Sequence, residues 1–121
     1  MNDAKAWPTE LRLAADKDRL TVAFDDGAGF VLPAELLRVL SPSAEVQGHA
    51  PSERRTQAGK RHVRIVTIEP IGNYAVRLVF DDRHETGIYA WDYLRKLGRD
   101  QDVLWADYLA ELDAKGLSRD P

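Results

Sequence analysis

Short alternating runs of apolar residues predict that this chain is built mainly from strands. Starting at Tyr74, bulky apolar residues occupy every second position up to Phe80, which is the pattern of a strand with one buried face. Gly72 and Asn73 precede this run and suit a two-residue turn, because glycine reaches positive φ without steric cost. We expect residues 63–71 to pair antiparallel with this strand. The other predicted strands are 9–13, 20–24, 30–32 and 86–89.

Three helices are predicted after the strands. Pro33 suits the first position of a helix that reaches about residue 40, because its missing N–H has no intrahelical partner there. A second helix begins near Trp91 and ends at Gly98. A third covers residues 100–115, and its apolar stripe predicts packing on the sheet or, alternatively, a partner-binding face. That stripe consists of Trp105, Tyr108, Leu109 and Leu112.

The order strand, strand, turn, strand, helix occurs twice along the chain. Residues 22–26 (VAFDD) match 78–82 (LVFDD), and 35–40 (ELLRVL) match 92–97 (DYLRKL). We therefore predict an α+β fold of two mainly antiparallel units whose sheets bury each other's apolar faces, plus a C-terminal helix. The alternative is that short strands followed by amphipathic helices look alike by chance. The predicted divisions are a flexible arm 1–7, a domain 8–98, a packed helix 99–116 and a tail 117–121.

Three stretches of the sequence resemble a known family. They are residues 72–75 (GNYA), His84 with 87–89 (GIY) and 91–94 (WDYL), and 36–49 (LLRVLSPSAEVQGH). On these residues the chain resembles, from about 8 to 97, the N-terminal domain of gamma-butyrobetaine hydroxylase. This domain of unknown function also occurs as a free-standing small bacterial protein. In that family the domain occurs joined to oxygenases or to iron–sulfur carrier proteins. The resemblance therefore implies an accessory module and not a complete enzyme. We therefore expect a non-enzymatic protein-interaction module linked to metal-cofactor or redox metabolism.

The resemblance also implies a lost zinc site. In the hydroxylases the segment after the first helix looks like Cys-x-Cys-x-x-Cys, and a histidine in a later turn completes the zinc ligands. Here Ser41, Ser43 and Val46 stand at the cysteine positions and His84 at the histidine position. Serine hydroxyls are poor zinc ligands and valine is none, so these residues cannot form a tetrahedral site. We expect the hydrophobic core to replace the stabilisation that the ion supplies.

His84 has three alternative roles. As a structural residue it would form a hydrogen bond to a serine near Ser41 or Ser43 and tie the central loop to the second unit. As a metal ligand it would need nearby partners and would favour iron or manganese, although zinc also stays open. As a plain turn residue it would be exposed. The candidate partners for a metal are Asp81, Asp82, Glu85 and His49.

Residues 41–62 form a long loop with almost no large apolar residue, which is typical of functional or disordered segments. Its basic residues are candidates for binding an acidic protein surface or a phosphate, and we expect the turn 81–84 to share that face. The alternative is a solvated loop, since no aromatic residue interleaves the charges. These basic residues are Arg54, Arg55, Lys60 and Arg61.

Composition narrows the function. The formal net charge of -3 argues against a protein whose whole surface is built to bind nucleic acid or an anionic membrane. The absence of cysteine excludes disulfides, thiolate catalysis and iron–sulfur clusters. No membrane-spanning run or signal-peptide pattern is present, so we expect a cytoplasmic protein. No catalytic motif is found, so we expect neither enzyme activity nor a cofactor. A small-molecule cleft lined by Tyr74, Tyr89 and Trp91 is a further alternative.

Overall fold

The computed structural model describes residues 7–121 and contains two three-stranded antiparallel sheets, which confirms the α+β prediction. Residues 1–6 of the predicted arm lie outside the described part. The first sheet contains β1 (Pro8–Leu13), β2 (Arg19–Phe24) and β3 (Gly29–Pro33) in that order. The second contains β4 (Ile65–Ile71), β5 (Ala75–Phe80) and β6 (Gly87–Ala90) in that order.

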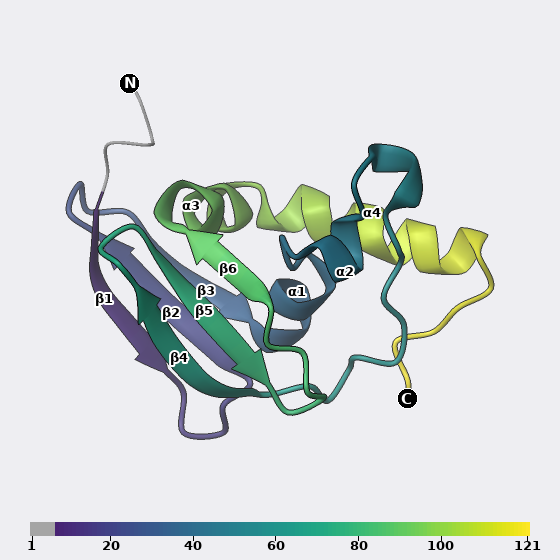
Figure 1. Ribbon diagram of the computed structural model, residues 1–121, viewed down its shortest axis with the longest axis horizontal. Helices are drawn as coiled ribbons and strands as arrows, with labels where there is room; N and C mark the ends of the chain where they lie inside the picture. Colours follow the sequence, from purple (N-terminus) through teal and green to yellow (C-terminus); the bar gives the residue numbers. More distant parts are fainter. Residues whose placement is uncertain (1–6) are drawn as a thin grey trace.

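Each sheet is followed by two α-helices, so the described residues contain four helices and not the three predicted. After β3 come α1 (Ala34–Val39), α2 (Ala44–Gln47) and a 3-10 turn, η2 (Pro51–Glu53). After β6 come α3 (Trp91–Arg99) and α4 (Gln101–Ala114). The strands lie on one side of the molecule, and α2 and α4 lie on the other (Figure 1). Among residues 7–121 no helix is both long enough and apolar enough to cross a membrane.

The two sheets bury their inner faces in one shared hydrophobic core. The alternating apolar residues of the central strands β2 and β5 all point into it, as the period-two pattern predicts. Each fully buried aliphatic or aromatic side chain contributes about 1.5–3 kcal/mol, so this core is the main source of stability. The core residues on β2 and β5 are Leu20, Val22, Phe24, Val76, Leu78 and Phe80.

The two halves repeat in detail, down to individual hydrogen bonds. In the turns after β2 and β5, a phenylalanine amide donates to a carbonyl four residues later. The pairs are Phe24–Ala28 at 2.8 Å and Phe80–His84 at 2.9 Å. The amide of the residue after each phenylalanine donates to the carbonyl of the residue that precedes the first strand of the same sheet. These pairs are Asp25 with Trp7 at 2.8 Å and Asp81 with Arg64 at 2.9 Å. These matches support a true internal repeat over chance similarity.

Two ion pairs, each between an aspartate of one half and an arginine of the other, link the halves reciprocally. Asp26, in the first turn, accepts hydrogen bonds from Arg95 of α3 at 2.5 and 3.2 Å. Asp82, in the equivalent second turn, accepts a bond from Arg38 of α1 at 2.8 Å. Since Arg38 and Arg95 occupy matching helix positions, each half supplies the cation that the other half's turn requires.

Three local predictions are wrong, because tertiary contacts override them. The β4–β5 loop has three residues, since Ile71 pairs with Ala75, and this leaves Tyr74 57% exposed and not on the buried face. Gly98 lies inside α3, where it packs against the Phe30 ring and does not end the helix. Pro33 is the N-cap of α1 and the last residue of β3.

α4 packs on α1 as well as at the edge of the shared core, where Leu104 and Trp105 lie, and the Gln101 side-chain amide donates to the carbonyl of Val31 in β3 at 3.0 Å. The predicted packing on a sheet is therefore only part of the contact that α4 makes. Its buried residues Tyr108 and Leu112 form a small second cluster with Val39 of α1. Leu109, predicted on the same stripe, is 39% exposed. The segment 117–121 is also ordered, because Ser118 and Arg119 accept backbone hydrogen bonds from Gly59 and Arg61. The predicted tail is therefore attached to the central loop.

Candidate functional site

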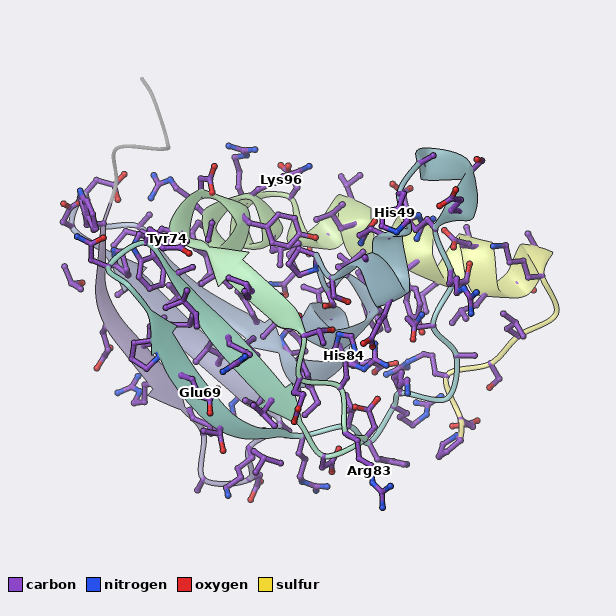
Figure 2. The ribbon with its side chains drawn as sticks, viewed as in Figure 1. His49, Glu69, Tyr74, Arg83, His84 and Lys96 are labelled. Carbon is purple, nitrogen blue, oxygen red and sulfur yellow. The ribbon has the colours of Figure 1, made fainter. Side chains whose placement is uncertain are left out.

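His84 lies at the centre of a buried polar cluster that joins the two halves. The ring points inward beneath α1 and α2, whereas the neighbouring Arg83 points into solvent (Figure 2). The hydroxyl of Ser41 lies 2.8 Å from Nε2 of His84, and that of Ser43 lies 3.3 Å from it. On the other side of the ring, Nδ1 lies 3.1 Å from Oε2 of Glu45. The hydrogen bond from a serine to His84, expected from the sequence, is present.

These contacts define the protonation state of His84. Hydrogen on Nδ1 is donated to Glu45, and the Ser41 hydroxyl then donates to the lone pair of Nε2. Burial lowers the pKa of His84, and the positive charge of Arg38 lowers it further, while the carboxylates of Glu45 and Asp82 act in the opposite direction. The net direction is downward, so the ring is neutral near pH 7.

We predict that this neutral histidine makes stability depend on pH. In the unfolded chain His84 has an ordinary pKa of about 6.5, whereas its pKa in the folded chain is lower. Unfolding therefore takes up a proton at any pH between the two pKa values. The free energy of unfolding should therefore fall as pH drops below about 6.5, and this loss should stop at the lowered folded pKa. Denaturant titrations from about pH 5 to about pH 8 measure it.

The matched variants are His84→Gln, which cannot titrate, and His49→Gln at an exposed histidine. His84→Gln should flatten this part of the pH profile even though it lowers stability at neutral pH, and His49→Gln should leave the profile unchanged. A slope that survives in His84→Gln would show that another group is responsible.

Serine, histidine and glutamate in this order resemble a nucleophile, its base and the group that orients the base. The distances between Ser41, His84 and Glu45 suit such a relay. Ser41, however, has 0% exposed surface, and a Cβ at Gly87 would lie only 2.6 Å from its Oγ. A substrate has no path to this hydroxyl in the folded chain. The cluster is therefore suited to holding the loop in place.

The weak metal candidates are brought together only in part. The side chain of Asp82 contacts the backbone of His84 and not its ring, because the His84 amide donates to Oδ1 of Asp82 at 3.2 Å. His49 is exposed, and its amide is bound by the carboxylate of Glu53. Val46 is buried and offers no donor atom. Within residues 7–121 no group of three or more His, Cys, Asp or Glu side chains is arranged to hold a metal ion. The donor set at the zinc positions does not fit zinc.

Asp82 connects the cluster to two cations. Its Oδ2 accepts hydrogen bonds from Nε of Arg38 at 2.8 Å and Nζ of Lys60 at 2.6 Å. Burial alone would raise the pKa of Asp82, but the bonds from Lys60 and Arg38 outweigh it and hold the pKa below its ordinary value. Lys60 is therefore part of the link between the loop and the second turn, although it was predicted to face a partner.

The other basic candidates do not form one patch. Arg54 is paired with Glu111 of α4, and Arg61 is paired with Asp120 of the final segment. Arg55 is exposed, and its side chain has no ion pair within the described residues. The loop is thus held by internal ion pairs, and Arg55 is the one of the four best placed to contact another molecule.

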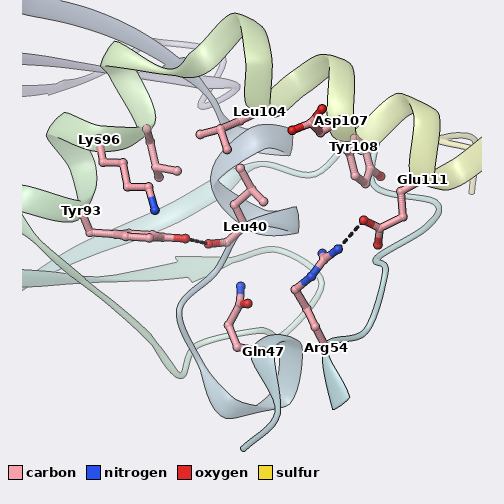
Figure 3. Close-up of a pocket in the computed structure, with 10 residues that line it drawn as sticks. Leu40, Gln47, Arg54, Tyr93, Lys96, Leu104, Asp107, Tyr108 and Glu111 are labelled. Carbon is pink, nitrogen blue, oxygen red and sulfur yellow. Dashed lines mark hydrogen bonds and ion pairs between the residues drawn. The ribbon is translucent and has the colours of Figure 1, made fainter. Parts of the chain in front are cut away.

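An open groove of about 260 Å³ lies between α4 and the loop (Figure 3). Its apolar lining comes from Leu40, Leu97 and Leu104, and the Tyr93 hydroxyl donates to the carbonyl of Leu40 at 2.5 Å. The ammonium of Lys96 points into the groove beside Tyr93, and no partner holds it among residues 7–121. The remaining polar lining consists of Gln47, Arg54, Asp107 and Glu111.

The predicted aromatic cleft is not formed by the residues named for it. Tyr89 is fully buried, burial raises its pKa, and its hydroxyl donates to the carbonyl of Leu37 at 2.5 Å. Tyr74 is exposed at the far end of the second sheet (Figure 2). The Trp91 indole donates to the carbonyl of Asn73. The groove is instead lined by Tyr93 and Tyr108. The sequence places Tyr108 on the apolar stripe of the C-terminal helix, but neither tyrosine was among the residues predicted to line a cleft.

Comparison with known proteins identifies the family. The model of the family described as gamma-butyrobetaine hydroxylase-like, N-terminal, matches residues 11–95. The chain belongs to this family. The family match begins within β1, includes the other five strands and the His84 cluster, and ends within α3, so α4 lies outside it. No curated protein matches.

Solved structures of similar proteins share all or most of this fold. Two solution NMR structures are 49% and 47% identical to this chain and superpose with a TM-score of 0.82 each. They cover 96% and 97% of this chain, and the chain covers 91% and 87% of theirs. A crystal structure from Acidithiobacillus ferrooxidans ATCC 23270, of a protein with unknown function in the DUF971 family, is 36% identical, with a TM-score of 0.65. The aligned region covers 81% of this chain and 98% of the chain in that crystal structure.

Proposed function

We propose that this family member is a non-enzymatic module that binds another protein through the groove between α3, α4 and the loop 41–62. The observation that carries this proposal is the contrast between two sites. The arrangement suited to catalysis, at Ser41 and His84, is sealed. The groove, by contrast, is open and contains the ammonium of Lys96, which pairs with no carboxylate in the described part of the chain. A module of this kind requires no cofactor, and we propose that it acts in the cytoplasm.

The chemistry of the groove indicates what the partner presents. The leucine-lined part suits an apolar side chain, and burial of such a side chain stabilises a complex by about 1.5–3 kcal/mol. Lys96 suits a carboxylate next to that side chain. Arg55 at the outer side of the loop would contact the rim of the partner, where charges mainly affect the association rate.

We predict that Lys96→Glu weakens partner binding by at least about tenfold, which corresponds to about 1.4 kcal/mol. The wild-type chain should retain a specific protein from extract of its own cells, and the affinity of the purified pair should then fall in the variant. Arg12→Glu is the control, because Arg12 is an exposed cation on β1, far from α4. Equal loss in both variants would contradict the assignment of the groove as the binding surface.

A further inference from the structure

A buried carboxylate on α1 is bound by an arginine from the segment that follows α4. Glu35 is 6% exposed, and its two oxygens accept hydrogen bonds from Nε and Nη2 of Arg119 at 2.8 and 2.7 Å. This two-pronged geometry matches the planar guanidinium and is not available to lysine. A buried carboxylate is costly without a cation, so the pocket around Glu35 requires a positively charged occupant.

An aromatic ring completes the pocket. The guanidinium carbon of Arg119 lies 5.1 Å from the centroid of the Trp105 ring, within the range of a cation–π interaction. A cavity of about 310 Å³ adjoins this contact and reaches Asp102, whose exposed carboxylate has no partner in the described part of the chain. The pocket therefore has more space and more negative charge than Arg119 uses.

The segment that supplies Arg119 is lightly attached. Its backbone accepts two hydrogen bonds from the loop, Gly59 to Ser118 at 2.9 Å and Arg61 to Arg119 at 3.0 Å. The additional ion pair, Arg61 with Asp120, is exposed, and exposed pairs contribute little. Most side chains of residues 117–121 are exposed. Apart from the pair that Arg119 forms with Glu35, the segment therefore has few buried contacts, and a competing guanidinium that replaces Arg119 on Glu35 can release it.

We infer that the pocket formed by Glu35, Trp105 and Asp102 docks an arginine-bearing segment of another protein, and that residues 117–121 occupy it in cis as a competitor. The carboxylate and ring already select a guanidinium, as the bound Arg119 demonstrates. The adjoining cavity accommodates neighbouring residues of the incoming segment. This site goes beyond the proposed function, since the groove lies on the other flank of α4.

The test uses the full chain carrying Arg119→Ala and the acetylated peptide LSRDP, which reproduces residues 117–121. In an NMR titration the peptide should bind saturably, shift the Trp105 indole and Glu35 amide signals, and bind at least tenfold more tightly than LSADP. Adding Glu35→Gln to the Arg119→Ala chain should abolish the difference between the two peptides. Equal affinity for both peptides, or shifts away from Trp105, would overturn the inference.

A second measurement uses the wild-type chain and does not depend on the variant folding. Excess LSRDP should move the amide signals of Ser118 and Arg119 towards those of a released segment, and LSADP should not. Signals that stay unchanged would show that residues 117–121 are not displaced from the pocket, which would overturn the inference. Dimerisation of the wild-type chain at the same concentration would assign the pocket to a second copy, which would overturn the assignment to a different protein.

Discussion

A chain with Ser41, Ser43 and Val46 all replaced by cysteine should bind one zinc ion and unfold at a much higher temperature with zinc than with a chelator. Two of these positions already place an oxygen 2.8 and 3.3 Å from Nε2 of His84. Glu45 holds Nδ1, an orientation typical of zinc-binding histidines. With free zinc at 1,000 times its Kd, the gain should be about 4 kcal/mol.

Elemental analysis and thermal unfolding, each with and without chelator, check this result. Adding His84→Ala to the triple variant should weaken zinc binding strongly, because it removes the fourth ligand. The wild-type chain is the reference and should retain no stoichiometric metal. Stoichiometric iron or zinc in the wild type that disappears in His84→Ala would favour the metal-binding alternative and show that the cluster is not a metal-free clamp.

Gly98→Val should lower the free energy of unfolding by about 3 kcal/mol, as overpacking in a tight contact does. A Cβ at Gly98 would lie 2.2 Å from Cγ of Phe30, so the ring or the helix must move. Ala110→Val is the matched control, since residue 110 lies on the exposed face of α4 and meets only the small helix propensity cost of valine. Denaturant unfolding compares the two. Equal costs would mean that α3 and β3 do not pack this closely.

The strands could be predicted because one buried face imposes a period of two on nearby residues. The hydrogen bond between His84 and a serine was also predictable, since the family resemblance places these residues together. Glu45, which binds the other ring nitrogen of His84, was missed because a glutamate in a segment expected to be a polar loop gives no local signal. Arg38 was missed for a related reason, as arginine in a short helix usually faces solvent.

Contacts between distant residues explain the remaining errors. Glu35 and Arg119 are 84 positions apart, so no local pattern reveals the pair or the attachment of the final segment. Gly98 has the position of a helix-ending glycine, but its lack of a side chain serves the approach of Phe30. Tyr74 continues the alternation of β5, yet the three-residue turn removes it from the strand. In each case a tertiary contact overrides a correct local tendency.

The reciprocal bridges between Asp26 and Arg95 and between Asp82 and Arg38 bear on how this architecture could have arisen. A single unit of this kind, expressed alone, would lack its own cation and could satisfy its aspartate only from a twin. That is the requirement of an isologous dimer. Gene duplication followed by fusion would preserve both bridges, and the sequences of the two copies could then diverge. One copy now has Ala28 and the other His84 at the same place.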